Sequence, residues 1–425
     1  MGKGEAKQPS GNSQKWLYNI RCFLLNITRL FRKRGACPLR RQLRTTGEHE
    51  MMRKSASIAA MIFLLGTGLA GAKETVRIGL ISPLTGDVKT FGESSRNAFY
   101  IALEEYGKTG KYTISPFIVD DRNDPTEGAN GALKLITQDK VRAFVGPLTS
   151  KVSIPVSEIA TKYKVPMITE AATNPKVTVY EGKRKPYVFR ACFTDPFQGY
   201  VAATFALRDL KVKTAAVLYD VGNDYSRGLA EVFKSTFEKG KGSVVAYESY
   251  QKDDVDFSAL ATKIRLKKPE LVFIPDYYNK AGLIVRQLRE KAVNCALIGT
   301  DGWDSPELIK IAGNTIVGGY FTNHYSPERK DKIAERFIAR YREKHGSVPD
   351  ALAALTYDAA MILLVTLDKL KEPSSEQLTK ALSQLKNFQG VTGVISFDKN
   401  GDAVKSAVIL RMEKNGPRYV TTVRP

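Results

Sequence analysis

Two polar residues follow predicted strands at the edge where open α/β sheets bind ligands. Ser150 follows the predicted strand Ala143–Val145 and begins a helix, where free backbone N–H groups and the helix dipole favour an anion. Asp301 follows the predicted strand Ala296–Gly299. Both also fit ordinary structural roles, because serine caps helices and aspartate before glycine is a common turn former. The pattern favours a small-molecule site and leaves the structural roles open.

Catalysis has little support in the sequence. Neither Ser150 nor Asp301 has a general base within its motif, and no Walker lysine motif, G-x-G-x-x-G after a strand, G-x-S-x-G or H-E-x-x-H occurs. His49 lies near the N-terminus, and His324 and His345 lack a cysteine or second histidine at ligand spacing, so we expect both at the surface. We predict no enzyme activity, no metal and no cofactor.

The chain is strongly basic, with a net charge of +21 over 425 residues. Residues 1–72 hold 13 Lys and Arg against 3 Asp and Glu, which is about half of the excess. The rest is spread over stretches such as Lys267–Lys268, with acidic residues interleaved. This spread indicates a solvated surface rather than a nucleic-acid groove.

Residues 51–72 have the three parts of an export signal. A charged start at Met51 leads into the apolar run Ile58–Leu69, and small residues end at Ala72. The run is shorter than the roughly 20 residues of a membrane-spanning helix, and no cysteine follows it to carry a lipid. We therefore predict cleavage after Ala72 and a soluble periplasmic product.

Residues 1–50 precede this signal, although signal peptides act at the N-terminus. We interpret them as a non-native or disordered extension, with translation beginning at Met51 or Met52. The alternative is a basic headpiece that would make the chain a DNA-binding regulator. A mature N-terminus at Lys73 would exclude that alternative.

From Val76 onward, short β-branched runs alternate with amphipathic stretches. This alternation predicts βα units and parallel sheets, in two series separated by the loop Thr173–Pro186. The expected strands are Val76–Ile81, Ile114–Val119, Ala143–Val145, Met167–Thr169, Ala215–Tyr219, Val244–Tyr247, Leu271–Ile274 and Ala296–Gly299. The expected helices are Phe91–Tyr106, Pro125–Gln138, Ser153–Tyr163, Ser226–Lys239, Phe257–Leu266 and Lys280–Lys291.

Three predicted helices in succession, Lys330–His345, Leu352–Lys371 and Ser375–Leu385, cannot extend a βα series and are expected to cover the first lobe. The extended segments Gly390–Phe397 and Ser406–Met412 follow, and we expect the last to join the second lobe. The fold class is α/β, with two doubly wound Rossmann-like lobes formed by residues 73–194 plus 323–404 and 195–322 plus 405–425. A hinge with three crossings, near Thr194, Thr322 and Val404, joins them.

Several motifs occur in a characteristic order along residues 76–425. They are Val76-Arg-Ile-Gly-Leu-Ile-Ser-Pro-Leu-Thr-Gly86, Asp120-Asp-Arg-Asn-Asp-Pro125, Gly146-Pro-Leu-Thr-Ser150, Pro166-Met-Ile-Thr-Glu-Ala-Ala-Thr173 and Gly299-Thr-Asp-Gly-Trp303. This order resembles the leucine/isoleucine/valine-binding branch of the type I periplasmic binding proteins. The resemblance implies a ligand held between two closing lobes, with the closed form docking on an ABC-type permease.

The resemblance also implies roles for eight residues. Ser150 matches the binder of the ligand carboxylate, and Asp301 the acidic partner of the ligand ammonium. The positions of Ala171 and Thr173 supply a carbonyl and a hydroxyl to the ammonium and a backbone N–H to the carboxylate. The remaining matches are Tyr225 and Tyr277, which shut over the ligand, Phe91, which lines its side chain, and Asp195, a polar residue at the lobe crossing. Ordinary packing and turn roles remain open for each.

Some positions depart from the family pattern. Asp301 is shorter than the glutamate of several members, and Glu170 brings a charge beside Ala171 that either draws a cationic ligand or points to solvent. Arg122 and Thr149 replace cysteines that some members pair. Trp303 stands beside Asp301 as a candidate pocket wall. Whether Cys192 and Cys295 form a disulfide stays open.

The resemblance implies an extracytoplasmic, monomeric substrate-binding component of an ABC importer, which binds a branched-chain or other apolar L-amino acid. The alternative of the same fold is a binder of amides, urea or aromatic acids, which serves transport or signalling. Such ligands lack an ammonium group. The carboxylate of Asp301 therefore separates the two hypotheses.

Overall fold

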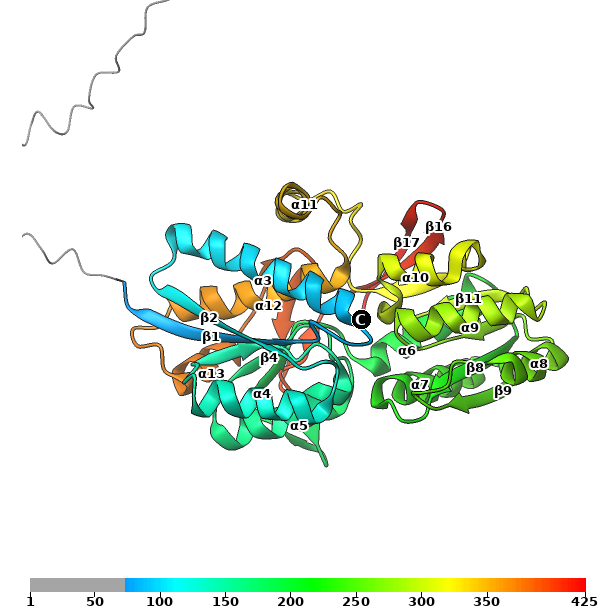
Figure 1. The fold of residues 1–425 in the computed structure, drawn as a ribbon, viewed down its shortest axis with the longest axis horizontal. Helices are drawn as coiled ribbons and strands as arrows, with labels where there is room; N and C mark the ends of the chain where they lie inside the picture. Colours follow the sequence, from blue (N-terminus) through cyan, green and yellow to red (C-terminus); the bar gives the residue numbers. More distant parts are fainter. Residues whose placement is uncertain (1–72) are drawn as a thin grey trace, which may run out of the picture. The chain divides into compact units, whose positions relative to one another are not determined.

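The computed structural model describes residues 73–425, which form one compact unit containing two large sheets and two small ones. The predicted signal and the extension before it lie outside the described residues. The helices and strands of the two sheets are visible as two groups in Figure 1.

The first sheet contains five parallel strands in the order β2-β1-β3-β4-β7. The strands are β1 (Thr75–Ser82), β2 (Thr113–Asp120), β3 (Ala143–Val145), β4 (Met167–Thr169) and β7 (Val188–Arg190). The helices that follow them are α3 (Lys89–Thr109), α4 (Pro125–Thr137) and α5 (Ser150–Tyr163). The crossover order around β1 is that of a doubly wound sheet, whose ligand edge lies at the carboxyl ends of the strands.

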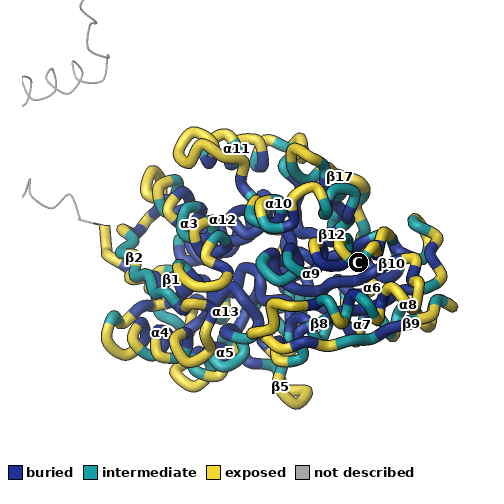
Figure 2. The backbone as a smooth tube through the Cα atoms, turned by 45° about the vertical axis from the view of Figure 1, so that its right-hand side comes forward, coloured by how far each residue is buried: buried dark blue, intermediate teal, exposed yellow. Residues whose placement is uncertain are grey.

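Three further helices, from late in the sequence, return to the first lobe as predicted. They are α11 (Lys332–His345), α12 (Ala351–Asp368) and α13 (Ser375–Leu382). The helix α12 packs on α3, β3 and β4, whereas α11 packs on α3 and α13 on α12. Among the described helices, α12 alone is long and apolar enough to span a bilayer, but it is buried within the protein. Figure 2 shows it as a dark blue tube beside α3. It therefore serves as a core helix, apolar on all sides because it is covered on all sides.

The second sheet has seven strands in the order β17-β16-β12-β11-β10-β8-β9. They are β8 (Thr214–Asp220), β9 (Ser243–Tyr250), β10 (Leu271–Phe273), β11 (Ala296–Gly299), β12 (Tyr320–Asn323), β16 (Ala407–Glu413) and β17 (Gly416–Val423). Its helices are α6 (Asp195–Arg208), α7 (Asp224–Lys239), α8 (Ser258–Lys267), α9 (Tyr278–Glu290) and α10 (Pro306–Ala312). β16 joins β12 antiparallel, which places the end of the chain in this sheet.

The chain passes from one sheet to the other after Arg190, after Asn323 and between Val404 and Ala407. The third passage follows a small sheet of β13 (Phe388–Gly390), β14 (Gly393–Phe397) and β15 (Ala403–Val404). Three passages make a hinge, because lobes linked by several strands rotate about them without separating.

Some elements were not expected from the sequence. The helices α6 and α10 and the strands β7, β12 and β17 were missed, and the loop after Thr173 contains the short hairpin β5 (Val179–Tyr180) and β6 (Lys183–Arg184). The helix α6 packs on α7 and β12, and its amphipathic pattern is weak because its exposed stripe includes Pro196 and Tyr200 rather than charged residues alone. The helix α5 begins at Ser150, three residues before its predicted range.

Candidate ligand-binding site

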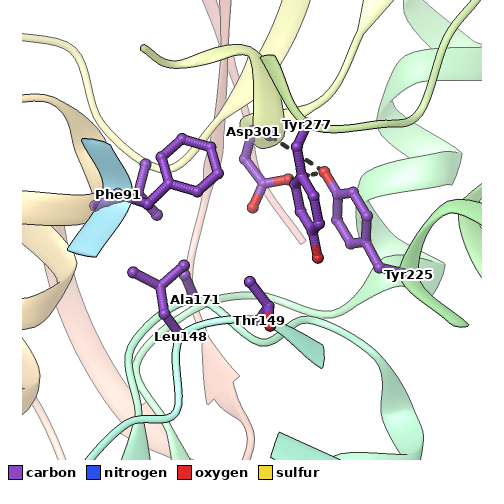
Figure 3. Close-up of a pocket in the computed structure, with 9 residues that line it drawn as sticks. Phe91, Leu148, Thr149, Ala171, Tyr225, Tyr277 and Asp301 are labelled. Atoms are coloured by element: carbon purple, nitrogen blue, oxygen red, sulfur yellow. Dashed lines mark hydrogen bonds between the residues drawn. The ribbon is translucent and has the colours of Figure 1, made fainter. Parts of the chain in front are cut away.

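A small enclosed cavity lies where the carboxyl ends of strands from both sheets face each other. It is lined by Phe91, Leu148, Thr149, Ala171, Tyr225, Tyr277, Asp301, Gly302 and Leu352. Figure 3 shows Phe91, Leu148, Thr149 and Ala171 facing Tyr225, Tyr277 and Asp301 across it. Five of the eight predicted site residues are therefore together: Phe91, Ala171, Tyr225, Tyr277 and Asp301.

The carboxylate of Asp301 is the polar centre of this cavity. Its Oδ1 accepts hydrogen bonds from the Tyr225 hydroxyl at 2.6 Å and from Gln198 Nε2 at 2.7 Å. Its Oδ2 lies 2.9 Å from His324 Nε2. Asp301 is only 4% exposed, so these three partners replace most of its hydration. Neither Gln198 nor His324 was identified from the sequence.

The prediction that His324 lies at the surface was wrong. The residue follows the unpredicted strand β12 and is 2% exposed, with its ring stacked on Phe193 at 3.6 Å between ring centroids. His345, at the end of α11, is exposed as expected. The polar residues around His324 in the sequence suggested exposure. Its burial follows instead from its position directly after the buried strand β12, which was not predicted.

Asp301 and His324 carry one negative charge between them at neutral pH. Burial lowers the pKa of His324 to about 4, because its effect exceeds that of the hydrogen bond to Asp301, which raises this pKa. Burial alone would raise the pKa of Asp301. Its hydrogen bonds, of which the one with His324 has the largest effect, hold this pKa below the usual value. Among the described residues no Lys or Arg nitrogen lies within 4.0 Å of this carboxylate. The cavity thus contains a buried anion whose protein partners are neutral.

Aromatic rings form one wall of the cavity. Tyr225 and Tyr277 stack with centroids 5.0 Å apart, and Phe91 meets Tyr277 edge to face at 5.9 Å. Gly302 lies against them: a Cβ there would be 2.8 Å from the carbonyl oxygen of Asp276 and 3.1 Å from the Tyr225 hydroxyl. Any larger residue at 302 would therefore displace the hydroxyl that binds Asp301.

The other predicted residues, Ser150, Thr173 and Asp195, are buried just outside the cavity lining. Ser150 is the first residue of α5, and its Oγ accepts a hydrogen bond from the backbone N–H of Asn174 at 3.2 Å. The carbonyl of Thr173 accepts from the backbone N–H of Asp195 at 2.9 Å, and the Thr173 hydroxyl has no partner. With the lobes closed, these three residues lie at the carboxyl edge of the first sheet, next to the cavity, but do not line it.

Asp195 lines a neighbouring cavity of about 260 Å³ between the lobes, together with Asn174, Asp224 and Arg227. Burial raises the pKa of Asp195 to about 8, against smaller opposing effects of the neighbouring Thr173 and Asn174. At neutral pH Asp195 is therefore mostly protonated and adds little charge next to Asp301.

Neither Glu170 nor Trp303 lines the cavity. Glu170 is fully buried and accepts a hydrogen bond from Ser95 Oγ at 3.0 Å, and burial raises its pKa to about 8. It therefore neither faces solvent nor supplies a charge to the cavity. The indole N–H of Trp303 donates to the Ile274 carbonyl at 3.2 Å, and its ring packs on Gly299. The expectation that Trp303 forms a pocket wall was wrong.

The lobes are closed over the cavity, which has a volume of about 10 Å³, room for about one water molecule. Contacts between the lobes hold this arrangement: Asn174 Nδ2 donates to the Asp224 carbonyl at 2.9 Å, and Lys176 pairs with the Asp224 carboxylate at 3.0 Å. Thr90 and Ser305 share a hydrogen bond of 3.0 Å at the other end. A ligand of amino-acid size can enter only when the lobes separate.

In residues 73–425 no group of His, Cys, Asp and Glu is arranged to hold a metal ion. Cys192 and Cys295, the two cysteines in this part of the chain, are not bonded to each other. The polar groups of the site are thus suited to hydrogen bonding and charge pairing.

Comparison with known proteins places this geometry in a family. The family model described as periplasmic binding protein matches residues 75–417. The Leu/Ile/Val-binding protein BraC3 of Rhizobium johnstonii is 32% identical over 348 residues, which cover 80% of this chain and 92% of the relative.

Two solved structures have the same fold. The leucine-binding protein LivK of Thermotoga maritima is 36% identical, with a TM-score of 0.79 over 82% of this chain and 99% of its own. The branched-chain amino acid transporter substrate-binding protein LivJ of Streptococcus pneumoniae, solved with isoleucine, is 30% identical, with a TM-score of 0.78 over 83% and 100%. The predicted two-lobed α/β fold is confirmed. The chain belongs to the periplasmic binding protein family.

Proposed function

We propose that this protein is the extracytoplasmic substrate-binding component of an ABC importer, which binds a branched-chain or other apolar L-amino acid by hinge closure. It acts as a monomer that hands its ligand to a membrane permease, and it binds without catalysis. One observation carries the proposal. The buried Asp301 carboxylate is ionised and has only neutral protein partners, so a ligand ammonium is the cation that completes the site.

The rest of the site suits the other parts of an amino acid. The first turn of α5, beginning at Ser150, presents free backbone N–H groups to a carboxylate. Phe91, Leu148 and Leu352 line the cavity with apolar surface, which suits an aliphatic side chain. The relatives named for leucine, isoleucine and valine support this ligand class over amides, urea or aromatic acids.

The closing movement belongs to the same proposal. One wall of the cavity comes from residues 73–194 plus 323–404 and the opposite wall from residues 195–322 plus 405–425, which we take as the two lobes. Tyr225, Tyr277 and Asp301 follow strands of the second lobe, whereas Phe91 and Ala171 belong to the first. Opening the hinge therefore separates the ammonium partner from the carboxylate-binding helix.

Thermal unfolding of the purified protein tests the ligand class. L-leucine, L-isoleucine or L-valine at about a hundredfold excess over Kd is expected to add about 2.7 kcal/mol of stability, because only the native state binds. Isocaproate, which is leucine without its amino group, is expected to give a much smaller shift. If urea, an amide or an aromatic acid raises the unfolding midpoint and no amino acid does, the proposed ligand is wrong.

Export is the second testable part of the proposal. The charged start, apolar run and small residues of 51–72 support cleavage after Ala72. We expect N-terminal sequencing of protein recovered from the periplasm of an expressing Gram-negative host to begin at Lys73. Recovery only in the cytoplasm, with residues 1–72 still attached, would refute periplasmic action.

A further inference from the structure

A second and much larger cavity lies at the hinge and shares no lining residue with the first. Its volume is about 810 Å³, within the range of roughly 300 to 1,000 Å³ that holds small-molecule ligands. It is built from the segments that follow β12, enter β14 and connect β15 to β16, together with the end of β17. Its walls therefore include two of the three passages between the lobes.

Lys405 is the unusual residue of this cavity. It is 4% exposed, and its ammonium donates to the Thr392 hydroxyl and, at 3.4 Å, to the Ala191 carbonyl. Among the described residues no carboxylate lies within 4.0 Å of it. The nearest attracting carboxylate is that of Asp358, which lies on the far side of Thr392 from the Lys405 ammonium. Its oxygens accept hydrogen bonds from the Thr392 hydroxyl and from the backbone N–H of Val391. A buried ammonium with only neutral direct partners is costly unless an anion joins it.

The charges around Lys405 also favour an anion. Arg329 and Arg424 line the same cavity, and Glu328 is its one acidic side chain. Glu328 is already paired with Arg418, which is outside the lining. Arg329 is partly neutralised by Asp331, whereas Arg424 has no ion-pair partner among residues 73–425. Pro425 also lines the cavity and brings the terminal carboxylate, but Lys405, Arg329 and Arg424 still outnumber the two acidic groups of the lining.

Apolar side chains on the cavity wall restrict the kind of anion. Val394, Val404 and Tyr419 line it and are among the most exposed large apolar residues of the described chain, at 49%, 51% and 44%. Exposed apolar surface gathered in a cavity is typical of a binding site. An inorganic anion would leave this surface in water, whereas an organic acid would cover it.

We propose that the hinge cavity is a second binding site, which takes a small organic carboxylate with an apolar body. The carboxylate contacts Lys405, Arg329 and Arg424 add positive charge to the lining, and the apolar body covers Val394, Val404 and Tyr419. His324 links this site to the first, because it lines the hinge cavity and also hydrogen-bonds Asp301 at 2.9 Å.

Calorimetric titration with benzoate, in the presence of saturating L-leucine, tests this site. The expected result is benzoate binding that persists when leucine fills the cleft, with benzyl alcohol and inorganic phosphate binding at least about tenfold more weakly, since each lacks one of the two features. Benzoate binding that leucine abolishes would place benzoate in the cleft and overturn the proposal. Phosphate binding as tightly as benzoate would overturn the ligand class.

Variants identify the residues. Lys405→Met is expected to weaken benzoate about tenfold or more, because it removes the buried charge. Lys414→Met, which removes the same charge from an exposed position after β16, is the matched control and should leave benzoate affinity unchanged. Arg424→Gln, at an exposed position that should not affect folding, is expected to weaken benzoate severalfold. Equal benzoate affinities in all three variants and the natural protein would refute the site.

The two proposals can fail separately. Loss of leucine binding in the natural protein would contradict the proposed function only, because the Lys405 and Lys414 comparison does not depend on leucine. Leucine affinity in Arg424→Gln should stay within about threefold of the natural value, since this exposed side chain lies outside the cleft lining. A circular dichroism spectrum confirms that each variant is folded.

Discussion

Asp301→Asn is expected to weaken L-leucine binding by about a hundredfold or more, because it leaves the ligand ammonium without its buried anion. The variant should fold normally. Asparagine can still accept from Tyr225 and Gln198, and the neutral His324 ring can adopt the tautomer whose Nε2 accepts from the new amide N–H. Calorimetric titration with leucine measures the loss.

The same variant separates charge pairing from general damage to the site. Isocaproate has the carboxylate and side chain of leucine but no ammonium, so its affinity should stay equal or rise in Asp301→Asn. The matched control is Asp209→Asn, at an exposed position at the end of α6, which should leave both affinities unchanged. An equal loss of leucine and isocaproate binding would show that Asp301 acts as a structural residue.

Two of the three hydrogen-bond partners of the Asp301 carboxylate, Gln198 and His324, could not be identified from the sequence. Gln198 lies on α6 and His324 directly follows β12, and neither element was predicted. The helix α6 gives weak helical periodicity because its exposed side also carries residues such as Pro196 and Tyr200, and β12 has only four residues. Each missed element thus concealed one partner of the site.

Regular alternation and position at strand ends were the reliable signals. The βα units from Val76 to Gly299 produce strong periodic patterns because each helix packs one of its own faces on a sheet and exposes its opposite face to solvent. Asp301 could be singled out because it follows β11 at a carboxyl end. Leu148 and Leu352 could not, since an apolar residue that lines a cavity looks the same in sequence as one that fills a core.

The sequence also does not indicate which buried charged residue holds the loop after β4, called the site loop here, in place. Arg190, at the end of β7, is fully buried and binds the loop that follows β4. It donates to the Ala172 carbonyl at 2.7 Å and to the Asn174 carbonyl at 2.9 Å, on either side of Thr173. Its Nε pairs with the Asp402 carboxylate at 2.6 Å, which ties this loop to the last hinge segment.

Arg190→Leu is therefore expected to reduce the free energy of unfolding by about 3 to 5 kcal/mol, because it leaves the buried Ala172 carbonyl without a partner and removes the ion pair of Asp402. Denaturant unfolding measures the loss. Arg208→Leu removes the same side chain from an exposed position at the end of α6, and should change stability by no more than about 0.5 kcal/mol. Arg190→Lys keeps the charge but not the fork of donors, so an intermediate loss is expected. Similar unfolding midpoints for Arg190→Leu and Arg208→Leu would mean that these contacts do not hold the site loop.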